Sequence, residues 1–201
     1  MGISIIMAST LQPYCNAATQ RDKKIVRAYE SLLKQAYKEW ELIVVSDGCK
    51  DTIELMKDRA DKCILIDKQP IWSGVPRNTG IDAAKYDTIV YLDNDDVFDT
   101  WHLEHIANNE FNDALLFGDL VPVERSIKYK EKLNTEDFRV RGVQRKRGFC
   151  GTSNIAHRKG YYWNDKSDYA HDWHFIKQFK ELQQIKYGGY MVCHIPKLYD
   201  I

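Results

Sequence analysis

This sequence has no charge imbalance, no cysteine pattern and no long apolar run. Its lysines and arginines equal its aspartates and glutamates at 29 each, so no global positive field would draw it to nucleic acid or to an anionic membrane. Its five cysteines are widely spaced and include no C-x-x-C pair, which argues against a disulfide framework or a zinc site. No window approaches the ~20 apolar residues of a membrane span, and no basic leader precedes an apolar stretch. We therefore expect a soluble, cytoplasmic protein.

Linker-like stretches are also missing. No segment is rich in proline, glycine and serine together, so nothing in the sequence divides the chain or marks a disordered tail. A length of 201 residues is enough for one sizeable core. We expect a single domain over residues 1–201, with a regular first half, 1–96, and a less regular second half, 97–201.

Apolar runs alternate with helical patterns along the first half. Four runs are typical of buried strands, at 3–7, 42–45, 63–66 and 88–92. Three segments between them have apolar residues at helical spacing, at 25–36, 53–60 and 78–84. This order predicts an α/β protein with a mostly parallel, Rossmann-like central sheet and helices on both faces.

The second half has a weaker pattern. Strands are expected at 114–121 and 154–157, a helix at 173–182, and a last apolar stretch at 190–195. Because strands outnumber helices here, we expect a mixed sheet. The densest basic run, 139–147, lies in a segment with two glycines, Gly142 and Gly148, and is expected to be a loop, either solvated or in contact with a diphosphate or acceptor.

Polar residues follow three of the predicted strands. Thr10 follows the first, Asp47 the second, and the acidic cluster 93–96 the fourth. In open parallel sheets ligands bind outside the carboxyl ends of the strands, because loops converge there. We expect these residues on one rim of the sheet.

The acidic cluster contains three carboxylates within four residues, Asp93, Asp95 and Asp96. Such groups repel one another unless they are solvated or share a cation. Hard oxygen ligands suit Mg²⁺ or Mn²⁺, usually with substrate phosphates completing the shell. An acidic, solvated turn is the alternative, but the position after a buried strand favours a metal.

Seven short motifs occur in a fixed order along nearly the whole chain. They are SIIMAST (4–10), SLLKQAY (31–37), ELIVVSDG (41–48), PRNTGI (76–81), YLDNDD (91–96), FGD (117–119) and HDW (171–173). Together they resemble the family 2 glycosyltransferases. The resemblance implies a GT-A fold and an inverting, metal-dependent enzyme that moves a sugar from a nucleotide-sugar, usually a UDP-sugar, to an acceptor hydroxyl. It also implies that 1–96 bind the donor and 97–201 the acceptor.

The resemblance assigns the nucleotide to residues of the first half. Asp47 would hydrogen-bond the donor base, and the loop around Ser9 and Thr10 would lie against the nucleoside. Arg77 would approach the donor. Asp47 has an alternative role as the cap of a helix that starts near Asp51.

By the same resemblance, residues 93–95 of the acidic cluster correspond to the family's D-x-D motif. Asp93 and Asn94 would contact the ribose, and Asp93 and Asp95 would hold Mn²⁺ or Mg²⁺. His194 lies where several family members carry a metal-binding histidine, and an imidazole is an ordinary third ligand for Mn²⁺. The alternative for His194 is a hydrogen-bonded histidine at a strand end.

Asp172 occupies the position of the family's catalytic base, next to Trp173. An inverting transfer needs a base that takes the proton of the acceptor hydroxyl, and a carboxylate can serve. The family usually has Glu before this aspartate, whereas this chain has His171. The alternative role for Asp172 is the N-cap of the helix that follows.

Three tryptophans, Trp72, Trp101 and Trp163, have side chains able to stack on sugar rings, although packing is the ordinary role of such residues. Two other functions fit part of the pattern. One is a catalytically degenerate nucleotide-binding module of the same fold. The other is a nucleotidyltransferase, which would need a glycine-rich loop after the first strand, and residues 8–16 contain no glycine.

Overall fold

The computed structural model describes residues 1–14, 17, 19–70, 74–122, 138–164 and 170–193. Its helices are α1 (Arg21–Leu33), α2 (Lys50–Met56), α3 (Val75–Ala83), α4 (His102–Ala107), α5 (His171–Ile176) and the short 3₁₀ helix η3 (Thr152–Asn154). Its strands are β1 (Ile3–Ser9), β2 (Trp40–Asp47), β3 (Lys62–Ile66), β4 (Thr88–Tyr91), β5 (Val97–Phe98), β6 (Ala114–Phe117), β7 (Asp119–Pro122), β8 (Phe138–Arg141), β9 (Ile155–Arg158), β10 (Leu182–Ile185) and β11 (Tyr190–Met191). No helix within these ranges is long and apolar enough to cross a membrane.

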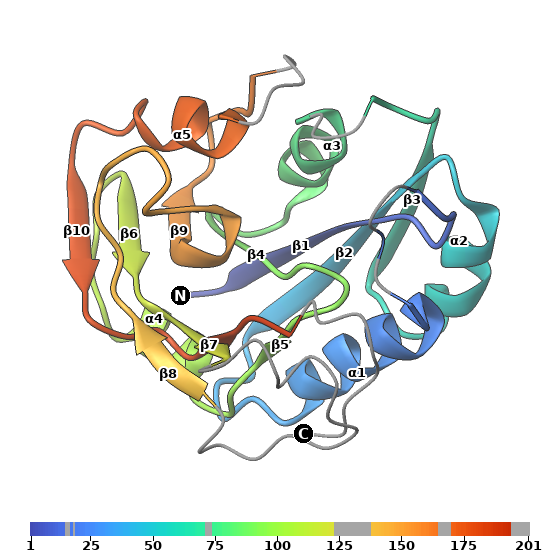
Figure 1. Ribbon diagram of the computed structural model, residues 1–201, viewed down its shortest axis with the longest axis horizontal. Coiled ribbons are helices and arrows are strands. Elements are labelled where there is room, and N and C mark those ends of the chain that lie inside the picture. The colour runs from blue at the N-terminus through green and yellow to red at the C-terminus, as the bar shows by residue number, and fades with distance from the viewer. Residues whose placement is uncertain (15–16, 18, 71–73, 123–137, 165–169, 194–201) are drawn as a thin grey trace.

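A seven-stranded sheet forms the centre of the molecule, in the order β10-β6-β9-β4-β1-β2-β3 (Figure 1). Strands β3, β2, β1 and β4 are parallel, and β9 is antiparallel to both of its neighbours, β4 and β6. Strand β6 therefore runs in the same direction as β4. This arrangement confirms the predicted α/β fold with a mostly parallel sheet that becomes mixed in the second half.

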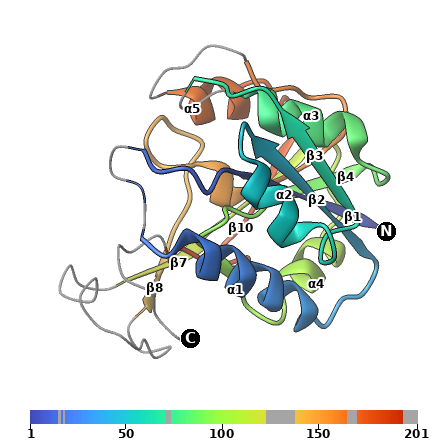
Figure 2. The same ribbon diagram turned by 90° about the vertical axis from the view of Figure 1, so that its right-hand side faces the viewer.

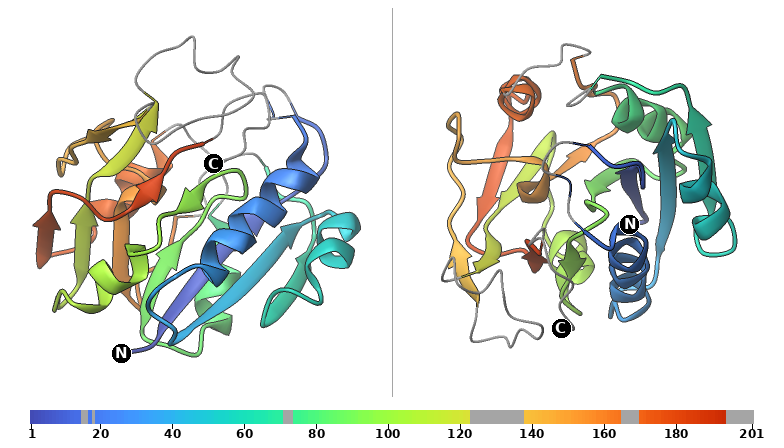
Figure 3. Two further views of the ribbon diagram at one scale, coloured as in Figure 1. Left: turned by 90° about the horizontal axis from the view of Figure 1, so that it is seen from below. Right: turned by 45° about the vertical axis from the view of Figure 1, so that its right-hand side comes forward.

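Helices lie on both faces of the sheet (Figure 2), and alternate residues of the strands pack against them. On one face, Ile5, Val44 and Val90 belong to a cluster that includes residues of α1, α2 and α4. On the other face, Ile6 and Val45 belong to a cluster with residues of α3 and α5. Figure 3 shows α1 lying across β1 and β2. Burial on both faces explains why these strands are continuous apolar runs.

A second sheet of four short strands, in the order β5-β11-β7-β8, lies beside the first. The sequence predicted one strand at 114–121, and this was wrong: β6 and β7 belong to different sheets and meet at Gly118. A side chain at Gly118 would collide with the backbone carbonyl oxygens of Lys186 and Arg141. The chain therefore changes sheets at a residue without a Cβ.

Two other predictions for the second half need correction. The helix expected at 173–182 ends at Ile176, and residues 182–185 form β10 instead. The Asp113 carboxylate accepts the backbone N–H groups of Lys180 and Glu181, both at 2.9 Å, and this directs the chain into β10. The basic run is also not all loop, because its first three residues belong to β8, which pairs with β7.

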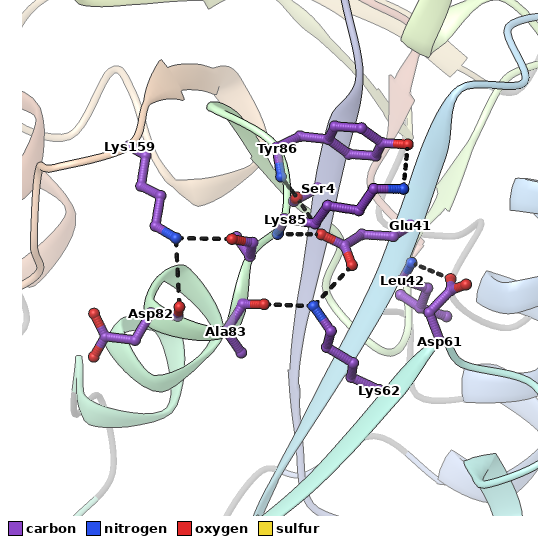
Figure 4. A network of polar contacts seen from close by, with 11 residues as sticks. Ser4, Glu41, Leu42, Asp61, Lys62, Asp82, Ala83, Lys85, Tyr86 and Lys159 are labelled. Carbon is purple, nitrogen blue, oxygen red and sulfur yellow. Dashed lines mark hydrogen bonds and ion pairs between the residues drawn. The ribbon is translucent and has the colours of Figure 1, made fainter.

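A buried carboxylate joins several elements at the end of the sheet opposite the predicted rim (Figure 4). The Glu41 side chain is 6% exposed and accepts hydrogen bonds from the Ser4 hydroxyl at 2.6 Å and the Lys85 N–H at 2.5 Å. The Lys62 ammonium lies 3.1 Å from Glu41 and also donates to the Ala83 carbonyl. Burial opposes ionisation of Glu41, but these donors and the Lys62 charge together lower its pKa.

We predict that Glu41→Gln destabilises the protein by about 1–3 kcal/mol at pH 7, because a buried acceptor of charge-assisted hydrogen bonds becomes neutral. Because its pKa is lowered in the folded protein, ionised Glu41 gives its full stabilisation above the ordinary Glu pKa of about 4.3. This stabilisation is lost as the pH falls through the pKa of Glu41 in the folded protein. The difference in unfolding free energy between wild type and variant should therefore shrink below about pH 4.3. Urea unfolding over pH 3–7 would measure it, with the exposed Glu54→Gln as control. A difference that is independent of pH would contradict this account.

Candidate active site

The carboxyl ends of β1, β2, β4 and β6 all lie at one rim of the large sheet, because these strands run in the same direction. Ser9 ends β1, Asp47 ends β2, and Asp93 comes two residues after β4. The segment that leads into β9 reaches the same rim, since β9 is antiparallel to its neighbours. The predicted meeting of the polar groups at one rim is confirmed.

Asp47 binds the segment that follows β3. Its carboxylate forms an ion pair with Lys68 and accepts the Gln69 N–H at 2.6 Å. Gly48 has a left-handed φ of 69°, and a Cβ there would lie 2.7 Å from the Cβ of Lys68. The N-cap of α2 is Cys49, with no side-chain cap hydrogen bond, so the alternative role of Asp47 as a helix cap is wrong.

Ser9 and Asn94 are brought together by the fold. Both are buried, and the Asn94 side-chain amide donates to the Ser9 hydroxyl oxygen at 2.7 Å. This bond ties the end of β1 to the acidic turn. The neighbouring Thr10 hydroxyl accepts the Gln12 N–H at 3.3 Å, which orders the start of the following loop.

The carboxylates of the acidic turn have different environments. The Asp93 side chain is 43% exposed and Asp95 is half-buried, whereas Asp96 is buried and accepts hydrogen bonds from the Tyr190 hydroxyl and the Cys193 N–H. Burial, with the charges of Asp95 and Asp93, raises the pKa of Asp96 well above its ordinary value. Asp96 thus holds the turn in place, and Asp93 and Asp95 are the carboxylates that reach the rim.

A divalent metal fits this donor set in part. Within the described ranges, no group of three or more His, Cys, Asp or Glu side chains is arranged to hold a metal ion. Two carboxylates on one turn are nevertheless a common protein contribution to Mg²⁺ or Mn²⁺, with phosphate oxygens and water supplying the other ligands. His194, the predicted third ligand, lies outside the described residues.

Two cationic residues of α1 lie behind the acidic turn, and the sequence analysis missed both. The Arg27 guanidinium donates to the Asp95 backbone carbonyl at 2.7 Å. Lys24 is fully buried, and burial lowers its pKa although the Asp95 charge opposes the shift. Lys24 was recognisable in principle, because it lies four residues before Ala28 on the buried face of α1.

Arg77 of α3 lies between the acidic turn and the second half of the chain. Its Nη2 atom is 3.9 Å from Asp93 Oδ1, and its guanidinium lies over the Trp163 ring, 4.6 Å from the ring centroid. The Arg77 charge also helps to lower the pKa of Asp172. One guanidinium is therefore close to both the predicted metal site and the predicted base.

Asp172 lies in the first turn of α5. Its Oδ1 atom accepts the Thr152 hydroxyl at 2.9 Å and lies 3.0 Å from His171 Nε2. Burial opposes ionisation of Asp172, but His171, Arg77 and Thr152 outweigh it and lower the pKa. The N-cap of α5 is Ala170, with no side-chain cap hydrogen bond, so the alternative role of Asp172 as N-cap is wrong.

An ion pair between buried Asp119 and exposed Arg141 supports the segment that carries Thr152. Asp119 is fully buried and accepts two hydrogen bonds from the Arg141 guanidinium, through Nε at 2.9 Å and Nη2 at 2.5 Å. The Ser153 hydroxyl donates to the same carboxylate at 2.9 Å. The FGD motif was visible in the sequence, but its partner on β8 was not, because that pairing depends on the second sheet.

The three tryptophans singled out in the sequence do not share a role. Trp163 is 3% exposed and stacks on Phe175, so packing is confirmed for it. Trp101 is half-exposed at the start of α4, a helix on the opposite face of the sheet from α3 and α5. Trp72 lies outside the described residues.

Solved structures with this fold include nucleotide-sugar enzymes. S. aureus TarS 1–349 has a TM-score of 0.67 and 17% identity, covering 96% of this chain and 60% of that one. Its complex with UDP-GlcNAc has the same TM-score and 18% identity, covering 96% and 58%. The mannosyltransferase PcManGT from Pyrobaculum calidifontis, in complex with GDP-Man and Mn²⁺, has a TM-score of 0.59 and 13% identity, covering 95% and 56%. This chain thus spans less than two thirds of the length of each.

These similarities show the GT-A fold that the motifs implied. No curated protein sequence matches the chain significantly. A family model described as glycosyl transferase family 2 matches residues 12–200. This protein belongs to glycosyl transferase family 2.

Proposed function

We propose that this protein is an inverting glycosyltransferase that uses a nucleotide-sugar, with UDP as the expected nucleotide, and a divalent metal, Mn²⁺ or Mg²⁺. The observation that carries the proposal is the position of Arg77, which is 3.9 Å from Asp93 and close enough to Asp172 to lower its pKa. A donor diphosphate beside Arg77 would have the acidic turn on one side and a base on the other. The structures of relatives with UDP-GlcNAc and GDP-Man support a nucleotide-sugar as the donor.

The first half, 1–96, is proposed to hold the donor. Asp47 would accept a hydrogen bond from the base in exchange for one of its contacts with Lys68 and Gln69. The loop after Ser9 and Thr10 would lie against the nucleoside, where the Ser9 hydroxyl still has a proton to donate while it accepts from Asn94.

The acidic turn is proposed as the metal site. Asp93 and Asp95 would hold the cation, with His194 as a third ligand. A bound cation would neutralise the charge that develops on the departing diphosphate. Arg77 would add a positive charge from the chain itself, in the place where the leaving group is expected.

The second half, 97–201, is proposed to hold the acceptor, with Asp172 as the base. The lowered pKa keeps this carboxylate ionised at neutral pH. Thr152 and His171 both contact Oδ1 of Asp172. Oδ2 faces Gly151, which has no side chain, and a Cβ added there would be 3.4 Å from Oδ2. Oδ2 is therefore the oxygen that would take the proton from an acceptor hydroxyl.

Two alternatives have less support. A degenerate nucleotide-binding module would have no need for an ionised Asp172 held by two donors beside Arg77. A nucleotidyltransferase would need a glycine-rich loop after β1, and residues 8–16 contain none. A mass-spectrometric screen of donor hydrolysis would test the proposal without knowledge of the acceptor, and release of pyrophosphate instead of a nucleoside diphosphate would favour the nucleotidyltransferase.

We predict that Asp95→Ala removes the metal-dependent part of nucleotide binding. Removal of a residue that only orients a metal ligand typically lowers metal affinity by about 10–100-fold. Removal of a ligand itself should weaken Mn²⁺-dependent binding of the nucleotide by at least as much. Thermal-shift measurements with UDP, with and without Mn²⁺, would detect it, because ligand binding raises stability. The exposed Asp58→Ala serves as control. Undiminished Mn²⁺-dependent stabilisation in Asp95→Ala would remove Asp95 from the metal site.

We predict that Asp172→Asn lowers the rate of sugar transfer by about 10²–10⁴-fold, because the amide cannot take a proton. The amide oxygen can still accept from Thr152, so the melting temperature and the affinity for UDP should change little. Thr152→Val, which removes the donor but keeps the carboxylate, should cost less activity than Asp172→Asn. Near wild-type transfer by Asp172→Asn would move the base elsewhere, with His171 and Asp168 as the next candidates.

A further inference from the structure

Trp163 lies at the point where the donor side and the acceptor side of the site meet. It belongs to the segment after β9 and is buried against α5, where its ring is parallel to that of Phe175 with centroids 4.1 Å apart. The Arg77 guanidinium of α3 lies over the same indole. The His171 ring, next to Asp172, is 5.7 Å from it. One side chain thus touches residues from α3 and α5, which cover the same face of the sheet (Figure 1).

A buried chain of hydrogen bonds fixes the orientation of this indole. Trp163 Nε1 donates to the Tyr91 hydroxyl at 2.8 Å, and that hydroxyl is 2.7 Å from His157 Nε2. His157 Nδ1 is 2.7 Å from the Arg158 carbonyl oxygen, which can only accept. Nδ1 must therefore carry the proton, and Nε2 accepts the proton of Tyr91. The direction of every bond in the chain follows from the carbonyl at its end.

Burial keeps this chain in a single protonation state. His157 and the Tyr91 ring lie inside the core, and burial lowers the pKa of His157 to about 4. The imidazole is therefore neutral at physiological pH, in the tautomer that the hydrogen bonds require. Each polar atom in this series of hydrogen bonds has a partner. The network therefore fixes one position of the indole without the loss of stability that an unpaired buried polar atom would cause.

The backbone of Trp163 is fixed independently of its ring. The Asn78 side chain accepts the Trp163 N–H at 2.8 Å and donates to the Trp163 carbonyl at 2.9 Å. Asn78 follows Arg77 on α3. The main chain of Trp163, whose ring lies under Arg77, is therefore bound to α3. A Cβ at Gly74 would collide with the Cβ of Trp163, at 2.4 Å, which shows how closely this end of α3 approaches it.

We propose that Trp163 is a positioning residue, which holds the Arg77 guanidinium at a fixed place relative to Asp172. The indole face attracts the cation and limits the freedom of the long arginine side chain. The same indole packs on α5, so a shift of α5 would move Arg77 as well. This proposal rests on the proposed function, in which Arg77 faces the donor diphosphate and Asp172 is the base.

A core-packing role and a positioning role predict different kinetics. Trp163→Leu removes the indole face and its N–H, and we expect kcat to fall by about 10²-fold, as for a misplaced catalytic group, with a raised KM for the donor. Phe179→Leu is the matched control, because Phe179 is equally buried in the same cluster and contacts Phe175, but not Arg77, among the contacts of the described residues. It should lower the melting temperature to a similar extent and leave kcat within about twofold.

A double-mutant cycle tests whether Trp163 acts through Arg77. Arg77→Gln removes the charge, and if Trp163 only positions that charge, adding Trp163→Leu to Arg77→Gln should cost little further activity. Tyr91→Phe, which keeps both rings but removes the hydroxyl, should give a smaller loss of the same kind. Measurements of UDP-sugar hydrolysis and transfer at saturating and limiting donor separate kcat from KM.

The outcomes distinguish the two proposals. If the wild-type protein neither hydrolyses nor transfers from any nucleotide-sugar, the proposed function falls, and the role of Trp163 in it falls with it. If the wild type is active but the effects of Trp163→Leu and Arg77→Gln are additive, or Phe179→Leu loses as much kcat as Trp163→Leu, then Trp163 is a core residue only. Loss of kcat in Trp163→Leu that is absent in the Arg77→Gln background supports the positioning role.

Discussion

The parallel pairing of β4 with β1, and of β1 with β2, is the constraint on which the candidate site depends. Parallel strands end at the same edge, so three turns that are far apart in sequence meet there. One of these turns carries Asp47 and another the acidic residues 93–96. The site therefore needs no special local structure, only burial of the strands on both faces, and that burial is encoded in their continuous apolar runs.

The second half of the site depends on contacts that strand pairing alone does not give. Asp172 reaches the rim because α5 packs on the sheet through Phe175 and Ile176. Thr152, which binds Asp172, lies in the segment before β9, and its neighbour Ser153 holds that segment to buried Asp119, the ion-pair partner of Arg141. Asp172, the proposed base, is thus oriented by residues from β7, β8 and η3, none of which belongs to the parallel part of the sheet.

The sequence was sufficient for the first half of the fold and insufficient for parts of the second, for a physical reason. Strands such as 42–45 are buried on both faces, and their composition alone marks them. The break at Gly118 depends on the backbone of Lys186, and the entry into β10 depends on the Asp113 carboxylate, so neither has a local signature. Asp47, Asp95 and Asp172 were expected from motifs, whereas the bond of Thr152 to Asp172 and that of Arg27 to the Asp95 carbonyl could be found only in the folded structure.

The Glu41 network lies at the opposite end of the sheet from the candidate site, joining β1, β2, β3 and the turn before β4 (Figure 4). The hydrogen bonds that align these strands are therefore separate from the turns that carry the polar groups of the rim. Substitutions at the rim can alter which molecules are recognised while the strand ends near Glu41 keep their alignment. Because the Glu41 network and the rim turns are separate, the residues of the rim can change in evolution without disturbing the alignment of the strands.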